Sequence, residues 1–188
     1  CLSVWSRIMA GSLIKLSDVS VSSDQSSVTL GASEWDSSYN VYYIALSGVE
    51  SDDTGTNRYL RMRVLTGGSA QDDSNYDYTH LGLWSNGSYQ DIGATDNDFW
   101  YISGAAQNGV EAAGKESCNG FLYLYQFNNS SAYSHFTQST AALNGDGNLY
   151  GAQGGGIKTT NEANNGVEFS FDGGNIRAGN FRLYAIKN

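Results

Sequence analysis

Acidic side chains gather between the apolar runs of this chain, and they are the residues whose types and spacing could support chemistry. They form three clusters: Glu50, Asp52 and Asp53; Asp72, Asp73 and Asp77; and Asp96 and Asp98. A glycosidase needs two opposed carboxylates, and calcium needs a loop rich in oxygen atoms. Acidic loops between strands are also ordinary solvated surface, and we expect that role here. The sequence therefore predicts no catalytic, cofactor-binding or metal-binding residues.

One further segment, Asn144-Gly145-Asp146-Gly147-Asn148, places oxygen atoms at alternate positions, as the calcium loop of an EF-hand does. The pattern then fails. Leu149 stands where the loop requires glycine, and Gly155 stands where it requires the bidentate glutamate. We do not expect calcium to bind to this segment.

The two histidines, His80 and His135, are the bases that a Ser-His-Asp triad would have to use. Both lie within alternating strand patterns, and the chain has no GxSxG, HExxH, CxxC or phosphate-loop motif. We interpret both as ordinary sheet residues and the protein as non-enzymatic. A polysaccharide depolymerase that uses two of the clustered acids is the less favoured alternative.

Aromatic residues make up 13% of the chain, with 13 tyrosines among them. Tyr76, Tyr78, Trp84 and Tyr89 surround one loop. Aromatic rings offer a large apolar face together with a polar tip, so this group could bind a glycan or a protein. The alternative is that half of these rings fill the core, since strands favour aromatic residues. Both interpretations stay open at this point.

Composition excludes several partners. The formal net charge of −9 disfavours nucleic acid and anionic membranes, and no apolar run reaches the roughly 18 residues of a membrane span. The two cysteines, Cys1 and Cys118, could form a disulfide, but we favour Cys118 as a small buried residue. Proline is absent, so glycine, asparagine, aspartate and serine must form the turns.

Short runs with period-two alternation follow one another along the chain, separated by turns such as Asn86-Gly87. They cover residues 12–16, 27–30, 41–46, 60–65, 76–84, 98–102, 121–127, 132–140, 149–151, 156–159, 167–171 and 181–186. This pattern predicts an all-β fold: a single-domain antiparallel β-sandwich of the jelly-roll kind. We expect the domain to span residues 12–188, with residues 1–11 as an N-terminal extension.

Three details of this prediction can be checked. The runs 167–171 and 181–186 should form a closing hairpin, with Phe181, Leu183 and Ala185 facing the core. The run 41–46 is apolar on both faces, which predicts a central strand that is covered on both sides. In the run 121–127, residues Phe121, Tyr123, Tyr125 and Phe127 should share one face.

Several motifs resemble a family of small virion structural proteins of tailed bacteriophages, often described as tail-fibre-like. The resemblance runs from Met9 almost to the end of the chain and leaves out Cys1–Ile8. Asn180 and Ala185 depart from the usual threonine and glycine of the family ending. The matching stretches are Met9–Leu16, Tyr39–Tyr43, Leu60–Arg63, Tyr76–Tyr78, Phe121–Asn128, Gly154–Gly156 and Gly174–Tyr184.

The resemblance implies a virion component that carries a β-sandwich and catalyses no reaction. Such a protein is displayed on the particle, as a fibre tip or as a capsid-bound knob, and mediates assembly and attachment to the host surface. It implies other virion proteins as partners and a homotrimer as the assembly. A carbohydrate-binding module that recognises host glycans through Tyr76, Tyr78 and Trp84 is the main alternative.

Overall fold

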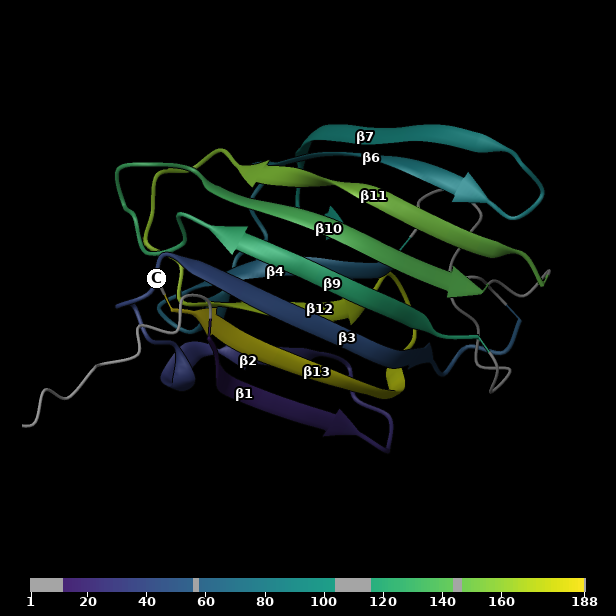
Figure 1. Ribbon diagram of the computed structural model, residues 1–188, viewed down its shortest axis with the longest axis horizontal. Helices are drawn as coiled ribbons and strands as arrows, with labels where there is room; N and C mark the ends of the chain where they lie inside the picture. The colour runs from purple at the N-terminus through teal and green to yellow at the C-terminus, as the bar shows by residue number, and fades with distance from the viewer. Residues whose placement is uncertain (1–11, 56–57, 104–115, 144–146, 188) are drawn as a thin grey trace, which may run out of the picture.

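The computed structural model describes residues 12–55, 58–103, 116–143 and 147–187. In this part of the chain two antiparallel sheets pack face to face, with the larger sheet in front in Figure 1 and the smaller one behind it. The predicted all-β, single-domain antiparallel sandwich is confirmed. The proposed extension of residues 1–11 and the EF-hand-like residues 144–146 lie outside the described residues.

The larger sheet has eight strands, and β1 and β7 form its two edges. Its order in space is β1 (Leu13–Val21), β13 (Ile176–Ile186), β3 (Val41–Ser51), β9 (Cys118–Tyr125), β10 (Ser134–Leu143), β11 (Leu149–Lys158), β6 (Tyr76–Trp84) and β7 (Tyr89–Asn97).

The smaller sheet has five strands, and the chain passes repeatedly between the two sheets. Its members are β2 (Val28–Gly31), β12 (Gly166–Phe171), β4 (Leu60–Thr66), β5 (Ser69–Ala70) and β8 (Trp100–Tyr101), the last of which pairs with β4. The only helix among the described residues is the single turn η1 (Ala32–Glu34), which could not cross a membrane.

Period-two alternation sends every second side chain of each strand between the sheets, where they form one core. On β13 the predicted inward residues Phe181, Leu183 and Ala185 are all fully buried. On β4, Leu60, Met62 and Val64 are buried, while the arginines between them are partly exposed. Burial of these apolar side chains is the main stabilising contribution to the sandwich.

Two glycines allow neighbouring strands of the smaller sheet to approach closely at the start of β12. Gly31 and Gly166 pair across β2 and β12, and Gly31 has a φ of 98°, which favours glycine. A Cβ atom on Gly31 would lie 2.8 Å from the carbonyl oxygen of Asn165. We infer that no other residue fits at this position of β2.

The predicted closing hairpin is wrong. β12 pairs with β2 and β4 in the smaller sheet, whereas β13 pairs with β1 and β3 in the larger one. The segment between them therefore forms a corner from one layer to the other. Its loop is held by Asp52, whose carboxylate accepts the backbone and side-chain N–H groups of Asn175, both at 2.7 Å. A glycine-rich link between two alternating runs does not by itself distinguish a hairpin from such a corner.

Three other strand predictions need correction. The runs 149–151 and 156–159 belong to one strand, β11, and the polar strand β7 was not predicted at all. Phe127 does not share a face with Phe121, Tyr123 and Tyr125: it is fully buried. The chain reverses its facing at Gln126, which has a φ of 63°.

Candidate functional site

A row of tyrosines crosses the outer face of the larger sheet, the face that turns away from the smaller sheet. Tyr184 on β13 pairs with Tyr43 on β3, which pairs in turn with Tyr123 on β9. All three side chains are partly exposed. Directly opposed residues on neighbouring strands project from the same face. The register therefore forms one aromatic platform from three strands that are far apart in the sequence. We call these three residues the tyrosine row.

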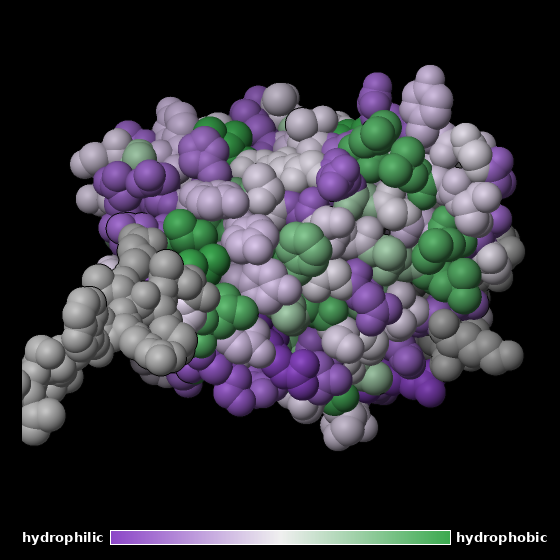
Figure 2. All heavy atoms as spheres, in the orientation of Figure 1, coloured by the Kyte–Doolittle hydropathy of each residue, from purple (hydrophilic) through white to green (hydrophobic). Residues whose placement is uncertain are grey.

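The tyrosine row is a contiguous cluster of rings. The ring centroid of Tyr43 lies 5.3 Å from that of Tyr123 and 6.0 Å from that of Tyr184. Phe121 extends the cluster along β9, with its ring 6.0 Å from Tyr43 and 39% of its surface exposed. Tyr125, on the other side of Tyr123, lies at 6.4 Å. Figure 2 shows that the middle of this face is pale and green, with few strongly hydrophilic residues.

The phenol groups of the tyrosine row are suited to binding a ligand. Burial raises the pKa of Tyr43, and the neighbouring phenols of Tyr123 and Tyr184 raise it further. The hydroxyl group therefore stays protonated at neutral pH and can both donate and accept a hydrogen bond. Rings with polar tips at their rims suit a ligand that combines apolar faces with hydroxyl groups.

The prediction that residues 41–46 are covered on both sides is wrong. Strand β3 is central, and Tyr42, Ile44 and Leu46 are buried against the smaller sheet. The outer face of the same strand carries Tyr43 in a partly exposed position. A strand of this composition is apolar on both faces because one face forms the core and the other forms the tyrosine row.

Of the two interpretations left open for the rings around residues 76–89, the exposed patch does not hold for Tyr76 and Tyr78. Tyr76 is fully buried and Tyr78 is 8% exposed, with edge-on contacts to Trp100 and Tyr101. Trp84 is partly buried and meets Tyr150 edge-on at 4.9 Å. Of the four residues only Tyr89 is strongly exposed, at 74%. The core interpretation of these rings is thus confirmed for Tyr76 and Tyr78.

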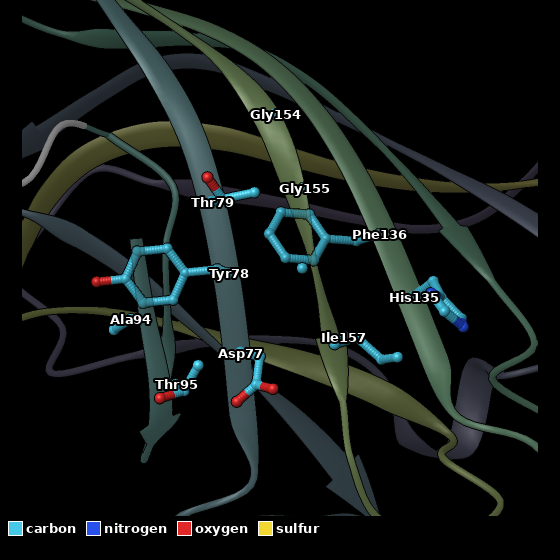
Figure 3. A pocket seen from close by; sticks show the side chains of 11 residues that line it. Asp77, Tyr78, Thr79, Ala94, Thr95, His135, Phe136, Gly154, Gly155 and Ile157 are labelled. Atoms are coloured by element: carbon cyan, nitrogen blue, oxygen red, sulfur yellow. The ribbon is translucent and has the colours of Figure 1, made fainter. Parts of the chain in front are cut away.

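A groove of about 480 Å³ lies beside the row on the same face. Figure 3 shows its floor as the bare backbone of β11 at Gly154 and Gly155, between side chains of β6 and β10. Asp77, Thr79 and Thr95 line one side, and His135 and Ile157 line the other. This volume falls in the range of small-molecule sites.

Most of the acidic clusters are engaged in structural contacts. Asp53 forms a 2.6 Å ion pair with Arg58, Asp98 pairs with Arg63, and Asp73 pairs with the fully buried ammonium group of Lys158. Burial raises the pKa of Asp73, but hydrogen bonds from Lys158 and Asn75 outweigh that effect and hold it below its ordinary value. These carboxylates fix loops to strands.

The histidines lie in strands, as predicted. His80 on β6 is buried, and burial lowers its pKa to about 4. His135 is exposed on β10 at the groove. Cys118 is a buried free thiol, as favoured above, and burial raises its pKa to about 12. Cys1 lies outside the described residues. Within those residues, no three side chains of the metal-ligating types come together.

The sequence contained only part of the signal for the tyrosine row. Alternation on β13 places Tyr184 on the face opposite Phe181, together with the charged Arg182, and that face was predicted correctly. It does not show which strands lie beside β13. Comparison of the chain with protein-family models, curated proteins and solved structures found no match.

Proposed function

We propose that this protein is a non-enzymatic glycan-binding module displayed on the surface of a tailed-phage particle, and that the tyrosine row is its contact surface. The observation that carries the proposal is the position of Tyr184, Tyr43 and Tyr123 on the solvent side of the larger sheet. Large aromatic side chains in that position contribute little to the core, so a partner is the physical reason to place them there.

The charge of the chain supports this choice of partner. Aromatic platforms also bind single-stranded nucleic acid, but those sites combine the rings with a basic groove. This chain has a net charge of −9, and such a charge repels polyanions. A carbohydrate chain has apolar ring faces and hydroxyl groups and does not require a basic site.

The virion setting is supported by the family-like motifs, especially the ending Gly174–Tyr184 that forms most of β13. In that setting the particle would present many copies of the same face, and weak binding at each copy would add up to firm attachment. Immunogold labelling of intact particles would test the location: label on the particle surface is expected, and unlabelled particles would contradict it.

Binding is tested on an array of bacterial surface polysaccharides with the Tyr43→Ala/Tyr123→Ala double variant. We expect the wild type to retain a polysaccharide that the double variant loses, because removing an aromatic anchor from an interface commonly costs more than about 1 kcal/mol. Tyr133→Ala is the matched control, since Tyr133 is 42% exposed and lies outside the row. Equal binding by the double variant and the wild type would refute the proposal.

Assembly with other copies is a second candidate function, supported by a separate apolar corner of the same face. Leu81, Leu83 and Tyr89 on β6 and β7 and Leu149 on β11 are all exposed, the leucines by 39–52%. Figure 2 shows apolar groups gathered toward the right of this face. We propose that this corner is buried in the homotrimer. Sedimentation should show a trimer for the wild type and a monomer for Leu83→Glu. A monomeric wild type would exclude this role.

A further inference from the structure

The groove and the tyrosine row share one line of register across the larger sheet. Tyr123 on β9 is opposite Thr137 on β10, Thr137 is opposite Gly155 on β11, and Gly155 is opposite Thr79 on β6. With Tyr184, Tyr43 and Gly93 this line crosses seven strands, a distance of about 29 Å at the usual strand spacing. The aromatic half and the glycine half are therefore two parts of one track.

Gly155 keeps the floor of the groove at the level of the backbone. A Cβ atom on Gly155 would lie 2.3 Å from the carbonyl oxygen of Phe136. Close strand packing therefore excludes a side chain at this position. The tyrosines rise above the sheet on one half of the track, and the other half is recessed.

The walls of the recess carry hydrogen-bonding groups. The Asp77 carboxylate accepts the backbone N–H of Asp96 through Oδ1 at 2.9 Å, and its Oδ2 has no protein partner within the described part of the chain. The hydroxyl groups of Thr79 and Thr95 and the exposed imidazole of His135 complete the polar lining. These groups match a ligand with several hydroxyl donors and acceptors.

The distribution of charged residues on this face restricts the class of ligand that the groove can bind. Asp77, Asp91 and Asp96 lie on the two strands that end this side of the face. Lys15 and Arg182 lie at the opposite side, and both are paired with Asp18, at 3.1 Å and 3.3 Å. The recessed half therefore repels anions and accepts neutral hydroxyl-bearing groups.

We infer that the groove is a second subsite of the tyrosine row, and that it takes the hydroxyl-rich end of a neutral, linear glycan lying across the strands. This inference rests on the proposed function of the row. Stacking on the tyrosines supplies affinity for many sugars. Hydrogen bonds from the groove then select uncharged chains long enough to reach it.

The test uses calorimetric titration with two-unit and six-unit oligomers of glucose, N-acetylglucosamine and galacturonic acid. The wild type should bind a neutral six-unit oligomer about tenfold more tightly than the two-unit form, which corresponds to one or two extra hydrogen bonds. It should bind the galacturonate oligomer more weakly. Failure to bind either neutral six-unit oligomer, or a preference for galacturonate, would overturn the inference.

Three variants separate the groove from the row. Thr79→Trp fills the groove from an exposed position and should remove the length advantage while two-unit binding persists. Gln153→Trp, the control at an exposed position on the same face outside the groove lining, should keep it. Asp77→Asn should reduce the discrimination against galacturonate. If Thr79→Trp keeps the length advantage while Tyr43→Ala weakens binding at both lengths, the groove is no subsite but the proposed function stands. If Tyr43→Ala has no effect, the proposed function itself fails.

Discussion

Two adjacent rows of the larger sheet, one on each face, differ in how their residues are used. The inner row runs through Leu183, Ile44, Leu122, Gln138, Gly154, His80 and Ile92, and the outer row is the track that begins at Tyr184. Both rows carry large side chains on β13, β3 and β9. Only the inner ones are buried. The difference indicates that the inner side chains stabilise the fold and that the outer side chains are available for binding.

The side chains of both rows change in type beyond β9. Beyond β9 the outer row becomes recessed, and the inner row becomes polar at Gln138 and His80. The Oε1 of Gln138 and the Nε2 of His80 are buried with no hydrogen-bond partner among the residues that the structure describes. Buried polar atoms without partners destabilise a fold. In the inner row these destabilising atoms therefore lie beyond β9, and not in the half of the sheet that carries the tyrosine row.

The largest expected effect compares two neighbouring residues on β13. Leu183→Ala should lower the free energy of unfolding by about 2–5 kcal/mol, since it opens a cavity in the core. Tyr184→Ala should lower it by less than about 1 kcal/mol, because its side chain packs on one side only. Urea unfolding of both variants measures the difference. Similar losses would remove the distinction between the two faces.

Acid should destabilise the protein through His80, in the polar half of the inner row. The pKa of His80 is about 4 when folded against 6.5 as its ordinary value, so the unfolded chain binds the proton first as the pH falls. Stability is then lost between about pH 6.5 and pH 4. At pH 5 this effect is worth about 2 kcal/mol. His80→Leu should remove this loss. The difference in free energy of unfolding between the variant and the wild type should therefore shift in favour of the variant from pH 7.5 to pH 5. Parallel pH profiles would contradict this account of His80.

A smaller effect on stability is expected at Gln138, the other polar residue of the inner row. Gln138→Leu should raise the free energy of unfolding by up to about 1 kcal/mol, because it removes the unpartnered oxygen and only one weak 3.5 Å contact, to the carbonyl of Tyr101. Thermal unfolding would measure it, with Gln153→Leu on the exposed face as the control. A clear loss of stability would show that the amide is satisfied by a group such as a buried water.

Local alternation was enough to predict the fold class and most strands. It failed where pairing with a neighbouring strand, and not the local sequence pattern, decides the structure. Strand β7 carries Asp91, Gly93 and Asp96, residue types of low strand propensity, and it forms because β6 offers a pairing partner along most of its length. The corner between β12 and β13 was mistaken for a hairpin for the same reason, since pairing partners far along the chain decide the outcome.

The candidate site could be predicted only in part. The facing of Tyr184 followed from the pattern around Phe181, but the row exists only because β3 lies between β13 and β9. On β6 the facing could not be assigned from hydropathy. Tyr76, Tyr78 and His80 point inward and Leu81 and Leu83 point outward, because the inward side must pack against Trp100 and Tyr101.

The most direct test of the account maps binding onto the two faces. A ¹³C,¹⁵N-labelled sample is titrated with the six-unit glucose and N-acetylglucosamine oligomers, and shift changes are followed by NMR. We predict changes at the ring signals of Tyr43, Tyr123 and Tyr184 and at Thr79, with the smaller sheet unaffected. Changes confined to the smaller sheet, or none with either oligomer, would contradict the claim that the outer face binds neutral glycans.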